Sequence, residues 1–221
     1  MSEEARRPRI AVVDYGAGNL VSIEQALTSV GATVTVARDG VATRDVDAIV
    51  VPGVGAAAPA MARLERRGLV EPIRAWIAAD RPFLGICLGL QLLFEGSDED
   101  GATTLGVLPG RTSQLVDAPT LPHIGWNQVV RTREHPLFDG IADGADLYFV
   151  HSYAGVAASE AEDAVLARTD HGRPFVSAVA RGRLLGVQFH PERSGTDGLR
   201  LLANFVGLVR AGTAATAGVA A

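Results

Sequence analysis

The sequence predicts an α/β domain of three layers, in which a mixed, mostly parallel central sheet lies between helices. Short β-branched runs alternate with amphipathic helical runs, and neither an internal repeat nor a linker interrupts them. With 221 residues, 48% of them hydrophobic, the chain can bury the core of one such domain. We therefore expect one domain over residues 9–210, a disordered leader over residues 1–8 and a disordered Ala/Gly/Thr tail over residues 211–221.

Short apolar runs in the first half of the chain predict strands. They are residues 10–13, 33–37, 48–51 and 83–86. The run at 48–51 is apolar throughout, which is typical of a strand covered by helices on both faces.

Helical periodicity fills the gaps between these strands. Apolar residues spaced by three or four place a helix over residues 20–30. Gly31 follows it, and glycine readily adopts the left-handed conformation in which helices end. Further helices are expected over residues 69–77 and 88–94.

The second half predicts antiparallel hairpins, which makes the sheet mixed. Short runs separated by turn residues occur at 127–130, 147–150, 175–180 and 184–189. Gly182 marks a tight turn between the last two runs. A final amphipathic helix, over residues 197–210, is expected to pack back on the sheet.

Composition excludes several classes of protein. One cysteine cannot form an internal disulfide, which argues against a secreted disulfide scaffold and favours the cytoplasm. The formal net charge is −5 and all 20 basic residues are arginine, so no basic surface for nucleic acid or an anionic membrane is expected. The uncharged stretches fall short of the ~20 apolar residues of a membrane span, and the first residues lack the apolar core of a secretory signal.

Residues 85–91 read Gly-Ile-Cys-Leu-Gly-Leu-Gln and join a predicted strand to a predicted helix. This pattern predicts a nucleophile elbow, a turn so sharp that only glycine fits on both sides of the nucleophile. Cys87 would then be the nucleophile, and the free N–H groups at the start of the helix favour its thiolate. The alternative is that Cys87 is a small buried hydrophobic residue, as lone cysteines often are.

His190 is the best candidate for the base that a thiolate enzyme needs. It ends an apolar strand, and Glu192 lies two residues on, where an extended chain points in the same direction. A carboxylate there would orient the imidazole and complete a Cys-His-Glu triad. The alternative is a His-Pro turn beside a solvated glutamate. His135 and His171 lie in loops and are expected at the surface.

Further patterns bear on binding sites. Residues 52–55, Pro-Gly-Val-Gly, follow a predicted strand and could turn backbone N–H groups toward an oxyanion. Residues 14–19 form only half of a dinucleotide fingerprint. A zinc site lacks a fourth ligand and a closely spaced Cys/His pair. No metal and no cofactor are therefore expected.

The segments at 85–91 and 189–192 (Phe-His-Pro-Glu) resemble those of the class I, or triad, glutamine amidotransferases, whose domain is flavodoxin-like. Within that family, four segments resemble the glutaminase subunits of imidazole glycerol phosphate synthases. These segments are residues 14–20, 52–55, 122–127 and 148–153. The resemblance covers residues 9 to 210.

The resemblance implies an enzyme of histidine biosynthesis that hydrolyses L-glutamine to glutamate and ammonia through a cysteinyl thioester. Ammonia would pass to a (β/α)8-barrel cyclase subunit, which forms a heterodimer with the glutaminase. Glutaminase activity would be low until the cyclase binds its own ligand. Cys87 would attack the amide, His190 would act as acid and then as base, and Glu192 would orient His190.

The resemblance also implies roles for residues around this triad. The oxyanion donors would be Gly53, Val54 and Leu88. The glutamine-binding residues would be Gly55, Gln91, Ser152 and Tyr153. The residues facing the cyclase would be His123, Trp126, Tyr148 and Arg193.

Two positions depart from the family pattern, and three alternative functions stay open. Arg193 stands where the family usually has lysine, and Ala57 where it usually has an aromatic residue, so looser packing is expected under the oxyanion loop. The alternatives are a glutaminase serving anthranilate, carbamoyl phosphate, nucleotide or pyridoxal phosphate synthesis, a stand-alone cysteine peptidase or γ-glutamyl hydrolase, and a non-catalytic binding module. The last would require a broken triad.

Overall fold

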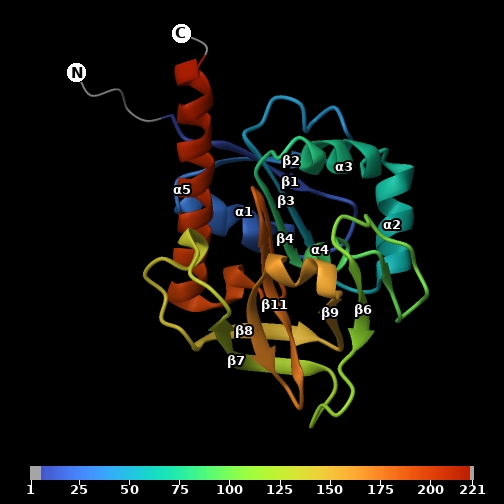
Figure 1. Cartoon of the computed structure of the whole chain (residues 1–221). Helices are drawn as coiled ribbons and strands as arrows, with labels where there is room; N and C mark the ends of the chain where they lie inside the picture. Colours follow the sequence, from blue (N-terminus) through green and yellow to red (C-terminus); the bar gives the residue numbers. More distant parts are fainter. Residues whose placement is uncertain (1–5, 220–221) are drawn as a thin grey trace.

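A twisted sheet of mixed direction forms the middle of the protein (Figure 1). The computed structural model describes residues 6–219, and side chains are described only as far as residue 212. Within that part of the chain, twelve strands form one sheet whose main path runs β2-β1-β3-β4-β12-β11-β10-β7-β8.

The parallel part of the sheet holds the strands of the first half of the chain. It contains β1 (Arg9–Val13), β2 (Thr33–Ala37), β3 (Ala48–Gly53), β4 (Phe83–Cys87) and β12 (Leu184–Val187). All pairings among these five strands are parallel. The four strands expected in the first half are therefore present in their expected places.

The antiparallel part of the sheet extends beyond β12. It contains β11 (Pro174–Arg181), β10 (Val165–Asp170), β7 (His123–Arg131) and β8 (Ala145–His151), with β9 (Tyr153–Ala157), β6 (Gly110–Gln114) and the short β5 (Gly96–Ser97) beside them. Apart from β5 with β6, these strands pair antiparallel. The predicted mixed sheet is confirmed, but "mostly parallel" describes only the part between the helix layers.

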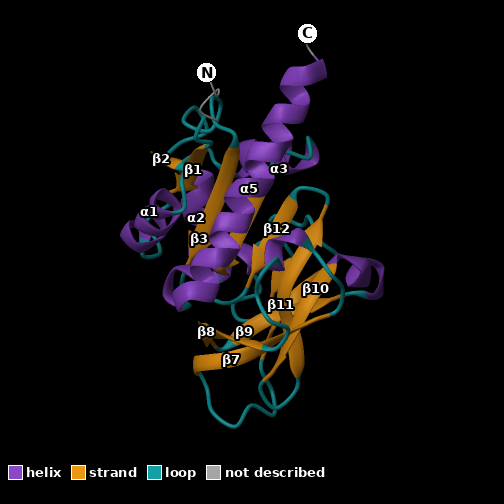
Figure 2. Ribbon diagram, turned by 90° about the vertical axis from the view of Figure 1, so that its left-hand side faces the viewer, coloured by secondary structure: helices purple, strands orange, loops and turns teal. Residues whose placement is uncertain are grey.

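Helices cover both faces of the parallel strands, which gives the three layers (Figure 2). The helices are α1 (Leu20–Ser29), α2 (Ala57–Arg66), α3 (Val70–Ala78), α4 (Leu88–Gln91) and α5 (Gly195–Val219), and short 3-10 helices span Pro136–Phe138, Ser159–Ala164 and Pro191–Arg193. Alternate residues of β1 enter two separate cores, because successive side chains point to opposite faces. Ile10 packs in the core under α1 and α5, and Ala11 in the core under α2 and α3.

The structure differs from the predicted elements in three places. The helical region before β4 is two helices, α2 and α3, with Gly68 between them. Helix α4 ends at Gln91 rather than residue 94, because the carbonyls of Leu92, Leu93 and Phe94 accept hydrogen bonds from loop residues 105–108. Strands β5, β6, β9 and β10 were not predicted.

The two predicted disordered ends also differ where the structure describes them. The side chain of Arg6 pairs with Asp47 and Pro8 is buried, so only residues 1–5 of the expected leader lie outside the described residues. Helix α5 continues to Val219 through the expected tail, since that segment is rich in alanine, the best helix former. Residues 220–221 lie outside the described part. No helix among the described residues is long and apolar enough to cross a membrane.

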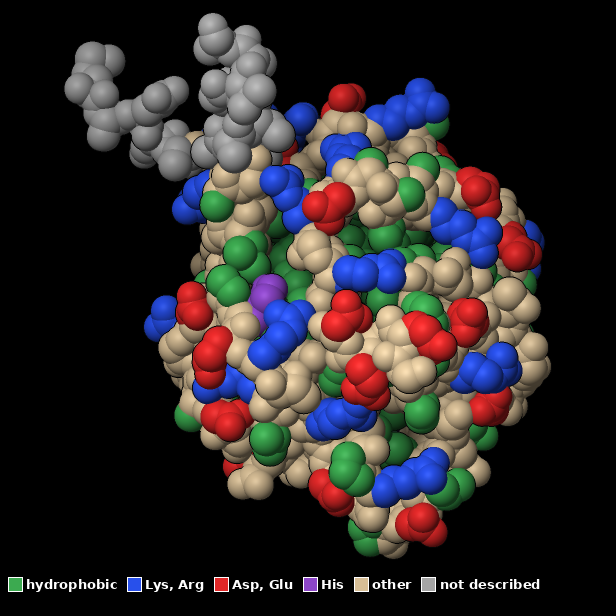
Figure 3. Space-filling view, viewed as in Figure 1, with side chains coloured by type: hydrophobic (Ala, Val, Ile, Leu, Met, Phe, Trp, Pro, Cys, Tyr) green, Lys and Arg blue, Asp and Glu red, His purple; other side chains and the backbone are tan. Residues whose placement is uncertain are grey.

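Charges of both signs are interspersed on the surface that Figure 3 shows. On that face the arginines alternate with acidic side chains, and neither sign gathers into a large patch. This agrees with the small net charge of −5.

Candidate active site

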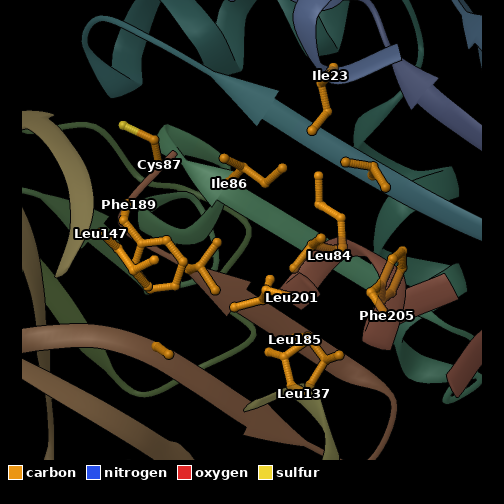
Figure 4. Close-up of a cluster of buried hydrophobic side chains, with 14 of the residues drawn as sticks. Ile23, Leu84, Ile86, Cys87, Leu137, Leu147, Leu185, Phe189, Leu201 and Phe205 are labelled. Carbon is orange, nitrogen blue, oxygen red and sulfur yellow. The ribbon is translucent and has the colours of Figure 1, made fainter. Parts of the chain in front are cut away.

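Cys87 ends β4 and lies on a sharp turn into α4. Its φ of 54° and ψ of −109° belong to a region that L-residues rarely adopt. A Cβ on Gly85 would collide with the carbonyl of Gly89, and one on Gly89 would collide with the carbonyl of Val51. The predicted elbow is therefore present, and both flanking positions require glycine. In Figure 4 the sulfur of Cys87 points away from the packed side chains of Ile86 and Phe189.

His190 and Glu192 form a buried pair beside Cys87. His190 Nδ1 lies 2.9 Å from Glu192 Oε1, and both side chains are less than a tenth exposed. The contact arises differently from the expectation of an extended chain, because Pro191–Arg193 is a 3-10 turn. The turn still brings the carboxylate to the imidazole.

The backbone around His190 is held by β8 and α5. The N–H of His190 donates to the carbonyl of Tyr148 at 2.8 Å. Ser194 Oγ donates to the carbonyl of His190 at 2.7 Å and accepts from the N–H of Tyr148 at 2.9 Å. The imidazole is thus fixed from its backbone as well as from Glu192.

The charge state of His190 is set by opposing effects. Burial lowers the pKa of His190, but the interactions with the Cys87 sulfur and the Glu192 carboxylate outweigh burial and raise the pKa to about 10. His190 Nε2 is buried and has no hydrogen-bond partner among the described residues. The arrangement favours the protonated imidazolium of His190, whose Nε2 has no hydrogen-bond partner among the described residues.

The loop at residues 52–55 lies next to the nucleophile because β3 and β4 pair in parallel. Gly53 is the register partner of Cys87 across these strands. The hydroxyl of Tyr15 lies under Gly53 so closely that a Cβ there would collide with it. Gly55 has a φ of +91° and open space around it. The loop is therefore tightly packed at its start and free at Gly55.

Tyr15 itself is an unusual neighbour. Its hydroxyl is buried and has no hydrogen-bond partner among the described residues. Burial, and secondarily the nearby Cys87, raises the pKa of Tyr15 above its ordinary value. The phenol therefore stays neutral beneath the loop.

A cavity of about 180 Å³ opens beside the sulfur. It is lined by the predicted residues Val54, Gly55, Cys87, Leu88, Gln91, Ser152 and Tyr153, and by Glu99, Pro122, Val150 and His151. A smaller cavity of about 80 Å³ lies on the side of His190, Glu192 and Arg193 and also reaches Gly53. The structure thus gathers the predicted catalytic, oxyanion and substrate-binding residues in one place.

Two residues of the site were missed by the sequence reasoning. Glu99 brings a carboxylate to the larger cavity, and burial, with a smaller contribution from Asp100, raises its pKa. Gln188 lies within hydrogen-bond distance of Cys87. The only sign of Gln188 in the sequence is a polar residue inside an apolar strand.

His123 and His151 form a buried pair on β7 and β8. His151 Nδ1 lies 2.9 Å from the carbonyl of Tyr153, so this nitrogen carries the proton and Nε2 accepts. His123 Nδ1 lies 3.2 Å from that Nε2, and Asn127 Nδ2 lies 3.2 Å from His123 Nε2. Burial is the main cause that lowers the pKa of His123 to about 4 and of His151 to about 3. Both rings are neutral.

Two of the residues expected to face a partner, His123 and Trp126, lie on opposite faces of β7. Trp126 is 56% exposed and Ile124 60%. His123 is only 4% exposed and stacks on His171 at 4.0 Å. The expectation that His123 faces a partner is wrong for this chain, because residues three apart on a strand point to opposite faces.

An exposed apolar patch results, which we call the β7–β8 patch. It consists of the exposed Ile124 and Trp126 on β7 and the half-buried Tyr148 beside Trp126 on β8. The Trp126 and Tyr148 rings meet edge to face at 6.1 Å, and the Arg193 guanidinium lies 4.3 Å from the Tyr148 ring centre. Val150, beside Ile124 in register, lines both cavities, so the patch borders the site.

Ala57, the second departure from the expected pattern, is the first residue of α2 and is buried. It packs in the core under α2 and α3 together with Tyr15. The group shown to pack beneath the loop is the hydroxyl of Tyr15, which lies against Gly53.

Comparison with known proteins gives a consistent result. Residues 11–208 match the family described as glutamine amidotransferase class-I. The chain is 52% identical to imidazole glycerol phosphate synthase subunit HisH of Chloroflexus aurantiacus, over 89% of this chain and 94% of that protein. It is 50% identical to the protein of the same name from Symbiobacterium thermophilum, over 89% of this chain and 92% of that protein.

Solved structures show the same fold at lower identity. The structure described as PurLQS from Thermotoga maritima has a TM-score of 0.72 at 19% identity, covering 92% of this chain and 99% of that chain. A structure described as a glutamine amidotransferase has a TM-score of 0.69 at 21% identity, covering 90% of this chain and 98% of that chain.

Proposed function

The chain belongs to the class I glutamine amidotransferase family, and from that premise we propose that Cys87, His190 and Glu192 hydrolyse glutamine in the cavity beside Cys87. The protein is the glutaminase subunit of imidazole glycerol phosphate synthase, an enzyme of histidine biosynthesis. One observation carries the assignment of the site. The thiol of Cys87 lies on the elbow, at the edge of a cavity and beside a buried His-Glu pair.

The first half of the reaction forms a thioester. The thiolate of Cys87 attacks the side-chain carbonyl carbon of glutamine, and the carbonyl oxygen becomes an oxyanion. Backbone N–H groups of Leu88 and of Gly53 or Val54 stabilise it, a contribution of about 10² to 10³ in rate for each donor. When the tetrahedral intermediate collapses, the C–N bond breaks and the imidazolium of His190 gives its proton to the leaving nitrogen, which departs as ammonia.

The second half releases glutamate. Neutral His190 takes a proton from a water molecule, whose oxygen attacks the thioester carbon. Collapse of the second intermediate breaks the C–S bond and returns the thiolate. Glu192 keeps Nδ1 of His190 protonated throughout, so that Nε2 is the nitrogen that exchanges protons.

The rest of the cavity supplies binding groups for an amino acid. Glu99 is the acidic side chain among its lining residues, and it is suited to the α-ammonium group of glutamine. Ser152 and Tyr153 lie on the same wall, at the turn between β8 and β9. Gln91 reaches the cavity, although its side-chain amide donates to the carbonyl of Tyr153.

We also propose that the partner subunit is a (β/α)8-barrel cyclase and that it docks on the β7–β8 patch. The patch borders both cavities, so ammonia formed at Cys87 would be released close to the covered surface. The single cysteine supports a reducing compartment, and we assign the complex to the cytoplasm.

The test compares two sources of nitrogen in the complex with the cyclase. We expect Cys87→Ala to lower glutamine-dependent synthesis by at least roughly 10³-fold, because no thioester forms. Synthesis from added ammonium should be retained, since it needs only the cyclase. Loss of both activities would contradict a role for Cys87 confined to ammonia release.

A second measurement tests dependence on the partner. Glutamine turnover should be low for the isolated chain and should rise when cyclase and its ribotide ligand are added. Full turnover by the isolated chain would favour a stand-alone hydrolase instead.

A further inference from the structure

Gln188 is a buried polar residue that the mechanism above does not use. Its side chain is 0% exposed, and it follows β12 two residues before His190. Its backbone N–H donates to the carbonyl of Ser177 at 2.9 Å, so it continues the sheet pairing. Burial of an amide is costly unless its polar atoms are bonded. The partners of this amide therefore indicate what it does.

The amide of Gln188 has only one orientation that satisfies its neighbours. Gln91 Nε2 donates to the carbonyl of Tyr153 at 2.8 Å and to Gln188 Oε1 at 3.1 Å. The Tyr153 carbonyl can only accept, so the nitrogen of Gln91 must face it. Gln188 must then present its oxygen to Gln91. Its own nitrogen is left facing Cys87 Sγ, at 3.6 Å.

We propose that Gln188 stabilises the thiolate of Cys87 by donating a hydrogen bond to its sulfur, and that Gln91 holds the Gln188 amide in the donating orientation. The proposal rests on the proposed function, since it concerns the nucleophile of that site. A thiolate accepts a hydrogen bond more strongly than a thiol, so a fixed N–H donor favours the charged form.

The donor works beside several titratable groups that face the sulfur or its cavity. They are His190 with Glu192 from the turn after β12, Tyr15 from the loop after β1, Glu99 from the loop after β5, and His151 from β8. Gln188 is neutral at every pH. Its contribution therefore adds to that of the His190 imidazolium without a titration of its own.

The orientation is reinforced from the far side of Tyr153. The Tyr153 carbonyl also lies 2.9 Å from His151 Nδ1, so both lone pairs of this oxygen have donors. A rotation of the Gln91 amide would break one of these contacts and place two oxygens together. These contacts thus fix the orientations of the side-chain amides of Gln91 and Gln188.

The first experiment measures the rate of alkylation of Cys87 by iodoacetamide as a function of pH, in the full chain. Gln188→Met keeps the length of the side chain and removes the donor. We expect the midpoint of its rate profile to rise by about one pH unit, which leaves roughly tenfold less thiolate below the midpoint. Gln188→Glu should raise the midpoint further, because a carboxylate opposes the thiolate.

Ser177→Ala is the matched control. Ser177 lies opposite Gln188 on β11, is equally buried, and its hydroxyl has no hydrogen-bond partner among the described residues. The pH midpoint of Cys87 alkylation in Ser177→Ala should equal that of the wild type. A folded Gln188→Met variant with an unchanged midpoint would overturn the proposal.

A second measurement needs no variant of Gln188. In protein labelled with ¹⁵N-glutamine, the side-chain amide signal of Gln188 should titrate with the midpoint of alkylation, and this titration should be absent in Cys87→Ala. An amide signal that does not respond to the ionisation of Cys87 would contradict the proposed hydrogen bond from Gln188 to the Cys87 sulfur. Neither readout uses glutamine turnover, so failure of the proposed function would be seen separately.

Discussion

Three buried polar atoms without hydrogen-bond partners lie around Cys87. They are the hydroxyl of Tyr15, Nε2 of His190 and Oε2 of Glu192, counted among the described residues. Each such atom costs about 1–3 kcal/mol relative to a bonded one. Unpaired buried groups of this kind are rare in folded proteins. Nε2 of His190 gains a partner when it gives its proton to the leaving nitrogen in the proposed mechanism, whereas the Tyr15 hydroxyl lies beneath the loop at Gly53.

Tyr15→Phe tests this at a single atom. Because no hydrogen bond is lost, we expect the free energy of unfolding to stay the same or to rise by up to about 1 kcal/mol. Urea denaturation measures it. Thr104→Val is the comparison, since the buried Thr104 hydroxyl donates to the carbonyl of Phe94, and it should destabilise by about 1 kcal/mol. Equal destabilisation by both changes would mean that the Tyr15 hydroxyl is bonded in solution.

The neutral pair His123 and His151 predicts how stability depends on pH. Burial lowers the pKa of both residues in the folded protein, to about 4 and about 3, below the ordinary value of 6.5. The unfolded chain therefore binds more protons at acid pH. The contribution of the pair is present above pH 6.5 and is lost as the pH falls from 6.5 toward these lower values.

His123→Gln checks the prediction. It should reduce the acid-side slope of the unfolding free energy by up to about 1.4 kcal/mol per pH unit, the contribution of one histidine. Urea denaturation at a series of pH values gives the slope. Identical slopes for the variant and the wild type would show that His123 titrates normally when folded.

At the scale of elements, replacing glycine by alanine is expected to change stability in opposite directions at two positions in or beside helices. Gly31 follows α1 with a φ of +95°, so Gly31→Ala should destabilise by about 1 kcal/mol. Gly207 lies inside α5, is exposed and has open space where a Cβ would stand. Gly207→Ala should stabilise by about 0.5–1 kcal/mol, because alanine is the better helix former. Thermal denaturation measures the change in melting temperature of each variant. Changes of the same sign in both variants would contradict the prediction.

The elements that sequence reasoning could predict are those whose pattern is local. Helix α1 has a periodic apolar face and a terminal glycine, and β3 is apolar throughout. The early end of α4 could not be predicted, because it depends on hydrogen bonds from a loop more than ten residues later in the chain. Strand β6 was missed because Gly-Arg-Thr-Ser-Gln lacks an apolar run and is a strand through its pairing with β9 and β5.

Some residues of the candidate site could likewise be predicted from a local pattern, and others depend on contacts between distant parts of the chain. Cys87, His190 and Glu192 could be predicted from short segments. Two glycines flank Cys87 in a nucleophile-elbow pattern, and Glu192 follows His190 by two residues. The burial of His123 follows from strand alternation and could have been predicted from the register of β7. The place of Glu99 at the cavity and the contact of Gln188 with Cys87 could not be predicted, because both depend on how distant parts of the chain meet near the end of β4.

At the scale of the whole molecule, the β7–β8 patch predicts where a partner binds. Trp126 is a large exposed aromatic side chain beside an exposed isoleucine, and such residues often dominate binding energy. Trp126→Ala should weaken binding to the proposed cyclase partner by about 2 kcal/mol or more and leave thermal stability unchanged. Isothermal titration calorimetry measures the affinity. Val41→Ala, at an equally exposed valine outside the patch, should bind normally, and a tryptophan variant with unchanged affinity would place the interface elsewhere.

The packing of the Tyr15 hydroxyl against Gly53 affects which part of the loop at residues 52–55 can move. Gly53 is held in the ladder beside Cys87 and has no room to move sideways, whereas Gly55 has open space and a backbone that glycine alone adopts freely. The loosely packed positions of this loop are therefore Val54, which is 46% exposed, and Gly55. A docked subunit could then gate the reaction by rotating a single peptide plane, with the nucleophile itself as a fixed anchor.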